Sequence, residues 1–182
     1  MAARTAERKC CYCRRNRSGE LRLYNPDMPT LDDVYQKFGF VAEAAQLLET
    51  ELGNLLLLYA GVEEKLHSIP NPTRAAELFQ EIDKHTLGQL IKKLKVKDKE
   101  IAKLEDVLGT ALDERNRLFH SFYRQHNFRR NSDQGRQLML DDLDSMHKTL
   151  LDAYKTVMLL QGVDLDGVSV EGAEALTQHL PL

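Results

Sequence analysis

Residues 30–63, TLDDVYQKFGFVAEAAQLLETELGNLLLLYAGVE, determine the fold class of this 182-residue chain. Their apolar side chains recur at alternating steps of four and three residues, which places them on one face of an α-helix. Thr30 is a typical N-cap residue, and two aspartates follow it in the first turn. We therefore expect a helix of about 30 residues, ended by Pro70 and Pro72. The apolar positions are Val34, Phe38, Val41, Ala45, Leu48, Leu52, Leu55, Tyr59 and Val62.

The same spacing returns in a second long helix, which Ser132 would cap and Gly162 would end. Its apolar side chains again alternate in steps of four and three, from Met139 to Leu160. Two short helices and one longer helix are expected between these two, because a helix-capping side chain precedes each apolar run. The predicted caps are Thr73, Thr86 (with Gln89 in a capping box) and Asp98.

The sequence has no strand-like alternation, so we expect an all-α helical bundle of three long helices and a few short ones over residues 30–162. Residues 1–29 are basic and aperiodic and are expected to form a mobile tail. Residues 163–182 are expected to be a C-terminal tail with a short helix from Ser169, and the polar residues 125–135 a loop. The two long apolar seams are also compatible with a dimeric coiled coil, but packing within one bundle is favoured.

The composition, 42% hydrophobic and 29% charged residues, is that of an ordinary globular protein. The longest apolar run, residues 55–60, is too short to span a bilayer, and no apolar segment typical of a signal peptide follows the N-terminus. We therefore expect a cytoplasmic protein with no membrane partner. Cys10, Cys11 and Cys13 provide neither a disulfide framework nor a full zinc ligand set, so a disordered tail is favoured over zinc binding or lipidation.

Charge is distributed unevenly along the chain, although the net charge is only −3. Residues 115–136 contain six arginines and one acid, whereas residues 137–182 contain eight acids and two lysines. A basic strip on an acidic body is typical of a confined anion-binding site. The strip also contains Tyr123, His126 and Phe128, whose rings would stack on RNA bases while the arginines bind phosphates. The alternative is a solvated loop that balances the acidic helix.

Residues 115–120, RNRLFH, contain the side chains best suited to catalysis. Arg115 falls on the apolar seam that continues to Leu118, a costly position unless the guanidinium is paired or hydrated. Asn116 and His120 are four residues apart and share a helix face beside that seam. An imidazole can take the proton of a ribose 2′-OH, and a guanidinium can bind phosphate oxygens as negative charge develops. This combination favours cleavage of RNA without a metal.

These residues resemble the R-N-x-x-x-H motif of HEPN domains, within a helical region of residues 31–161. The resemblance implies a metal-independent endoribonuclease that needs no cofactor and leaves a 2′,3′-cyclic phosphate. It also implies that Arg115, Asn116 and His120 are catalytic and that a homodimer combines two copies of the motif in one cleft. Members of the family often act as toxins or antiviral defence effectors, which implies an antitoxin or another regulatory partner protein. The expected RNA-binding residues are Arg117, Tyr123, Arg124, Arg129 and Arg130.

Two other functions are compatible with the sequence. A non-catalytic helical module would bind RNA, a nucleotide or a protein through the same residues without turnover. A helical scaffold would contain the motif by chance, with Arg115 paired to Asp113 or Glu114 and His120 on the surface. Residues 164–167, DLDG, resemble the start of a calcium loop, but the later ligands are missing and a turn is expected.

Overall fold

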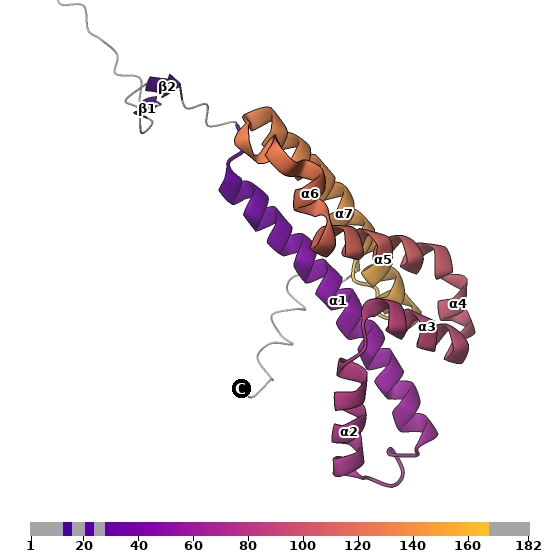
Figure 1. The fold of residues 1–182 in the computed structure, drawn as a ribbon. Coiled ribbons are helices and arrows are strands. Elements are labelled where there is room, and N and C mark those ends of the chain that lie inside the picture. Colours follow the sequence, from indigo (N-terminus) through magenta and orange to yellow (C-terminus); the bar gives the residue numbers. More distant parts are fainter. Residues whose placement is uncertain (1–12, 16–20, 24–27, 168–182) are drawn as a thin grey trace, which may run out of the picture.

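The computed structural model describes residues 13–15, 21–23 and 28–167 (Figure 1). Apart from one pair of short strands, the regular structure in these residues is helical, and the predicted all-α fold is confirmed. The longest helices are α1 (Leu31–Glu63), α5 (Glu105–His120) and α7 (Asp133–Leu160). The shorter helices are α2 (Pro72–Asp83), α3 (Leu87–Lys97), α4 (Lys99–Lys103), α6 (Phe122–His126) and the 3-10 helix η1 (Asn127–Asn131).

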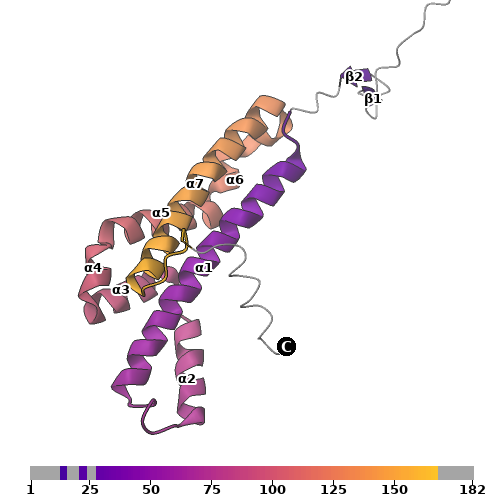
Figure 2. The ribbon, with the colours of Figure 1, turned by 180° about the vertical axis from the view of Figure 1, so that it is seen from behind.

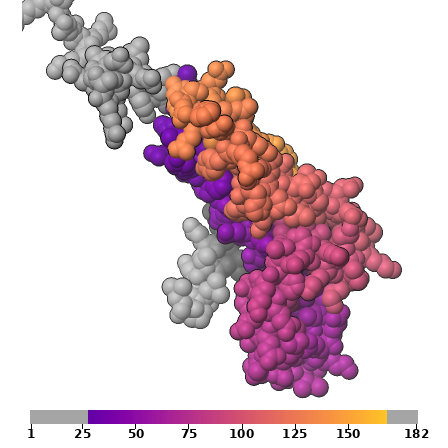
Figure 3. All heavy atoms as spheres, in the orientation of Figure 1, coloured from indigo at the N-terminus to yellow at the C-terminus, as the bar shows by residue number. Residues whose placement is uncertain are grey.

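Helices α1 and α7 lie side by side and run in the same direction (Figures 1 and 2). Near their first turns, Nε of Arg136 donates to the carbonyl oxygen of Pro29 at 2.6 Å. Near the end of α7, Nε2 of Gln161 donates to Oε1 of Glu51 at 2.8 Å. Helices α3, α4 and α5 complete the bundle, and α2 packs against the last part of α1 in an arm that projects from it (Figures 1 and 3).

The core consists of the two predicted seams facing each other, with α3 and α5 packed against them. The seam positions are fully or largely buried except at their ends, where Val62 is 55% exposed and Leu160 is 43% exposed. The seams are thus satisfied within one chain, as predicted. The largest fully buried side chains are Leu48, Leu52, Leu87, Leu90, Leu94, Ile101, Leu108, Leu118, Phe122, Met139, Leu143 and Met146.

Hydrogen bonds of side chains define most helix starts. In α1, Asp33 N donates to Thr30 Oγ1 at 3.2 Å and Thr30 N donates to Asp33 Oδ2 at 2.6 Å, which forms a capping box. Asp98 Oδ1 accepts from Glu100 N at 2.8 Å at the start of α4. Ser132 Oγ accepts from the backbone of α7, so this cap is confirmed as well.

The connection between α1 and α2 differs from the prediction. Helix α1 ends at Glu63, before either proline, where Lys65 takes a positive φ of 57°. Pro72 begins α2 instead of ending α1, because a proline at the first helical position has no hydrogen bond to lose. The N-cap is therefore Asn71, whose Oδ1 accepts from Arg74 N at 3.0 Å, and the predicted cap at Thr73 is wrong.

The long helix expected after Asp98 is divided into three. It is interrupted at Leu104 and again at Ser121, where φ is −138° and the hydroxyl donates to the carbonyl oxygen of Arg117 at 3.1 Å. The loop predicted for residues 125–135 is wrong, because α6, η1 and the first turn of α7 cover this stretch. Buried Phe122 and His126, one helical turn apart, hold α6 against the core.

The segment predicted as a mobile tail contains strands β1 (Cys13–Arg15) and β2 (Leu21–Leu23), which pair antiparallel with Cys13 opposite Leu23. Three-residue strands are too short for a period-two pattern to reveal. Cys10, Cys11 and the helix expected from Ser169 lie outside the described residues. The turn expected at residues 164–167 is present, since Asp166 N donates to Asp164 Oδ1 at 3.0 Å. No helix in the described part of the chain has the length and apolar character needed to cross a membrane.

Candidate functional site

Arg115 is held between α5 and α1 by weak contacts. Its side chain is 22% exposed, and Nη2 lies 3.6 Å from Oε2 of Glu49 on α1. Nη1 donates to Oδ1 of Asn116 at 3.4 Å, and the guanidinium carbon lies 5.1 Å from the centre of the Phe119 ring. Nε is buried and has no hydrogen-bond partner among the described residues. The guanidinium is therefore positioned but retains unused donors.

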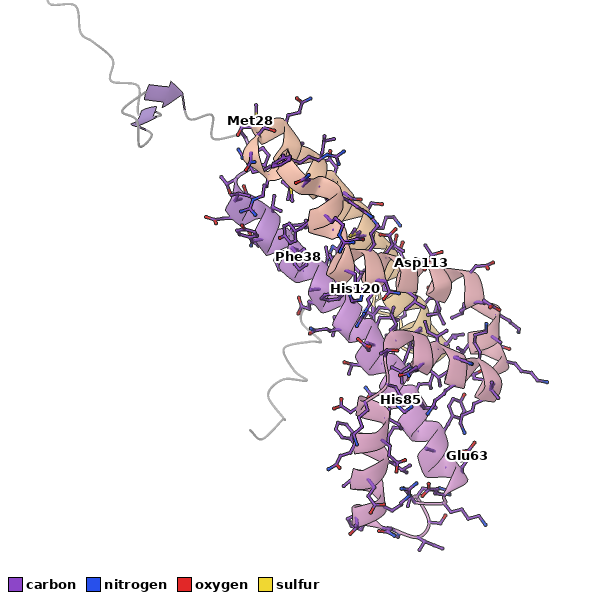
Figure 4. All side chains as sticks on the ribbon, viewed as in Figure 1. Met28, Phe38, Glu63, His85, Asp113 and His120 are labelled. Carbon is purple, nitrogen blue, oxygen red and sulfur yellow. The ribbon has the colours of Figure 1, made fainter. Side chains whose placement is uncertain are left out.

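His120 is the last residue of α5 and its side chain is exposed. Figure 4 shows His120 where the end of α5 meets α1. In the described part of the chain, no hydrogen bond joins its imidazole to another group. Asn116, one turn earlier, is also exposed and touches Arg115. The motif thus lies on the surface, at the end of a helix, with its imidazole open to solvent.

Helical geometry limits how the motif residues meet. Arg115 and His120 are five positions apart in α5, so the two side chains leave the helix about 140° apart around its axis and about 7.5 Å apart along it. Asn116 leaves the helix only about 40° from His120. The structure therefore brings Arg115 together with Asn116, and Asn116 onto one face with His120, and within the described residues no hydrogen bond joins Arg115 to His120.

Glu49 is a candidate site residue that the sequence analysis missed. Its side chain is 27% exposed and faces Arg115 from the opposite helix. The expected alternative partners of Arg115, Asp113 and Glu114, do not bind it, since Glu114 pairs with Arg117. No sequence pattern identifies Glu49, because the pairing depends on how α1 and α5 cross.

Arg117, expected to bind RNA, is engaged by carboxylates instead. Its Nη1 and Nη2 donate to Oδ2 and Oδ1 of Asp142 at 2.8 and 2.9 Å, a bidentate pair between α5 and α7. Its Nε and Nη2 also donate to Oε2 of Glu114 at 2.9 and 2.7 Å. The hydrogen bonds to Asp142 raise the pKa of Arg117 above its ordinary value. A guanidinium paired in this way is not open to a phosphate, so the structure does not support RNA binding by Arg117.

His126 extends the same network and does not stack on bases, because only 3% of it is exposed. Its Nε2 is 2.7 Å from Oδ2 of Asp142, and Nη1 of Arg129 is 3.2 Å from its Nδ1. These distances fit a ring that donates to the carboxylate and accepts from the arginine. Burial acts to raise the pKa of Asp142, but the hydrogen bonds from Arg117 and His126 outweigh it and hold that pKa below its ordinary value.

The basic strip is present on the surface beyond α5. Arg124, Arg129 and Arg130 are exposed, and in the described residues no carboxylate lies within 4 Å of their guanidinium nitrogens. Tyr123 is 41% exposed, and its ring is fixed by Phe122 with a centre-to-centre distance of 5.1 Å. Figure 3 shows α6 and η1, in orange, on the face of the bundle where α5 ends. Four of the five predicted RNA-binding residues are therefore accessible beside the motif.

The chain matches no protein-family model, and no similar protein was found among curated proteins or among solved structures. Within the described ranges, no three His, Cys, Asp or Glu side chains gather closely enough to hold a metal ion. The candidate site is accordingly defined by its own geometry: Glu49, Arg115, Asn116 and His120, with the arginines of α6 and η1 beside it.

Proposed function

We propose that the chain is a metal-independent endoribonuclease of the HEPN type, active as a homodimer and employed as a toxin or defence effector in the cytoplasm. The observation that carries the proposal is Arg115, which is mostly buried, keeps an unpartnered Nε and makes only long contacts, an ion pair with Glu49 and a hydrogen bond to Asn116. A buried donor without a partner costs about 1–3 kcal/mol, and such groups are uncommon unless they serve a function. Nε is closed to solvent in this conformation, so a phosphate oxygen would satisfy it once the side chain rotates toward the ligand.

The chemistry follows from the two side chains. His120 takes the proton of a ribose 2′-OH, and the 2′ oxygen attacks the adjacent phosphorus. The bond from phosphorus to the 5′ oxygen breaks, which leaves a 2′,3′-cyclic phosphate on one product and a 5′-OH on the other. Arg115 stabilises the extra negative charge on the phosphate oxygens, and Asn116 orients the phosphate or the imidazole.

A second copy of the motif, in a second subunit, would supply the general acid that one subunit lacks. The leaving 5′ oxygen needs a proton, and an imidazolium from the second subunit would donate it. The divergence of Arg115 and His120 around α5 also favours a site shared between two chains. Phe119, within the motif, is 42% exposed and would be covered in such a dimer. An antitoxin or another regulatory protein would restrain the activity.

The direct test is cleavage of RNA by the purified chain in excess EDTA. Arg115→Ala and His120→Ala should each lower the rate by about 10²-fold or more, because each removes a group that acts in the transition state. His67→Ala is the matched control, since His67 is exposed at the turn after α1. Circular dichroism should show unchanged helix content in all three variants. Cleavage that persists in both motif variants would end the proposal.

A non-catalytic RNA-, nucleotide- or protein-binding module is the second candidate. The observation that favours it is that no hydrogen bond joins Arg115 to His120 among the described residues. This candidate predicts RNA that is bound but intact after long incubation with the folded chain.

A further inference from the structure

We propose that a hollow between α6 and η1 binds one unpaired base of the RNA, an inference that rests on the proposed function for the identity of the ligand. The hollow has a volume of about 440 Å³ and lies on the face of the basic strip. We call it the aromatic hollow. It is lined by Tyr123, Asn127, Phe128, Arg130 and Asn131.

Two aromatic rings make the aromatic hollow suitable for stacking. Phe128 is 77% exposed, so its ring is accessible to a ligand. Tyr123 is held in place by Phe38 and Phe122, with ring centres 5.5 and 5.1 Å away, so its orientation is set before any ligand arrives. A base placed against these rings would cover the exposed face of Phe128.

The backbone around the aromatic hollow is strained. Asn127 has φ 37° and ψ −107°, a combination that non-glycine residues rarely adopt. This conformation separates α6 from η1 and places Phe128 after the turn. Strain of this kind, about 1–3 kcal/mol, tends to be retained at ligand sites. The side-chain amides of Asn127 and Asn131 make no hydrogen bond with other described residues, so both remain free for the edge of a base.

Position and charge connect the aromatic hollow to the motif. Arg130 is exposed on its rim and donates only a long hydrogen bond, 3.5 Å, to the hydroxyl of Tyr35. Arg124 and Arg129 lie nearby and, within the described chain, have no carboxylate partner. Tyr123 follows His120 by three residues, so their Cα atoms are at most about 11 Å apart. One RNA strand can therefore meet His120 with a phosphate and the aromatic hollow with a neighbouring base.

The ligand class follows from these groups. Rings stack on any base, and amides both donate and accept hydrogen bonds, so the aromatic hollow selects an unpaired base more than a particular sequence. A base inside a duplex has neither face free. We therefore expect the substrate to be single-stranded at, or next to, the cleavage position.

The test measures RNA binding by fluorescence anisotropy with the His120→Ala chain, which does not consume the probe. A single-stranded oligonucleotide should bind more tightly than the same strand in a duplex. Phe128→Ala should weaken binding of the single strand by about 5- to 160-fold, equal to the 1–3 kcal/mol of one stacked base. Phe79→Ala, which removes an exposed ring (56%) from α2, should leave affinity unchanged.

A scan with abasic nucleotides identifies the contact. At one position, removing the base should weaken binding and make Phe128→Ala neutral, because the stacking partner is already gone. If Phe128→Ala has no effect on the intact strand, or keeps its full effect at every abasic position, the aromatic hollow is not a base site. If the chain binds no RNA at all, the proposal that the aromatic hollow binds a base is also overturned.

The same experiments separate this inference from the nuclease proposal. Binding with the expected abasic pattern, together with no cleavage by the unaltered chain, refutes the nuclease and leaves the base site standing. Cleavage by the unaltered chain that Phe128→Ala does not change, with unchanged binding, refutes the base site alone.

Discussion

Asp142→Ala should destabilise the fold because Asp142 joins α5, α6 and α7 through two side chains. The substitution leaves Nε2 of His126, which is 3% exposed, without its acceptor, at a cost of about 1–3 kcal/mol. Arg117 also loses its bidentate partner but keeps Glu114, and with both partners about a quarter exposed this adds only about 0.5–1 kcal/mol. The expected loss of unfolding free energy is therefore about 1.5–4 kcal/mol.

The assay is urea denaturation followed by circular dichroism, with Asp141→Ala as the matched control. Asp141 is the neighbouring exposed residue, hydrogen-bonded to Gln137, so both variants gain the same helix propensity. Asp141→Ala should change stability by about 0.5 kcal/mol or less. Equal midpoints for the two variants would refute the assigned role of Asp142.

The stabilisation that Asp142 contributes through Arg117 and His126 depends on pH in a defined way. The pKa of Asp142 is lower in the folded chain than in the unfolded chain, so its stabilisation is present above the unfolded value and lost as the pH falls through the folded value. The difference in unfolding free energy between the unaltered chain and Asp142→Ala should be largest near pH 7 and should shrink below about pH 4. A difference in unfolding free energy that grows as the pH falls would contradict the stabilising role of ionised Asp142.

Two further predictions concern packing, each with its own control, and both are measured by urea denaturation. Leu48→Ala, at a fully buried position, should cost about 2–5 kcal/mol, whereas Leu47→Ala, 42% exposed, should cost less than about 1 kcal/mol. Gly135→Ala should destabilise strongly, because its Cβ would lie 2.1 Å from the carbonyl oxygen of Arg129, which is backbone and cannot turn away. Gly109→Ala, with nothing within 4 Å, should stabilise α5 by about 0.5–1 kcal/mol.

The long helices were predictable because their signals are local and repeated. The seam of α1 and the capping box at Thr30 depend only on spacing within the helix itself. The same holds for Ser132 at the start of α7. The interruption at Ser121 was not predictable, since the seam continues through Phe122 and only the conformation of one residue changes.

The sequence reveals the motif itself, but not the carboxylates that pair with its arginines. Arg115 stood out because a charge fell on an apolar seam, and the structure indeed buries most of its side chain. No sequence pattern indicates that Glu49 faces Arg115, or that Asp142 binds Arg117 and removes it from the basic strip, because both pairings join helices far apart in the chain. Charge counts along the chain therefore overestimated the number of arginines open to RNA.

The central claim, attack by a ribose 2′-OH assisted by Arg115 and His120, is tested most directly by the products. An end-labelled RNA is incubated with the chain in EDTA, alongside the same RNA with one 2′-deoxy nucleotide at the cleavage position. We predict a 2′,3′-cyclic phosphate end from the first RNA and no cleavage at that position in the second. Cutting at the deoxy position, or a first product that ends in a 3′-OH, would contradict the claim.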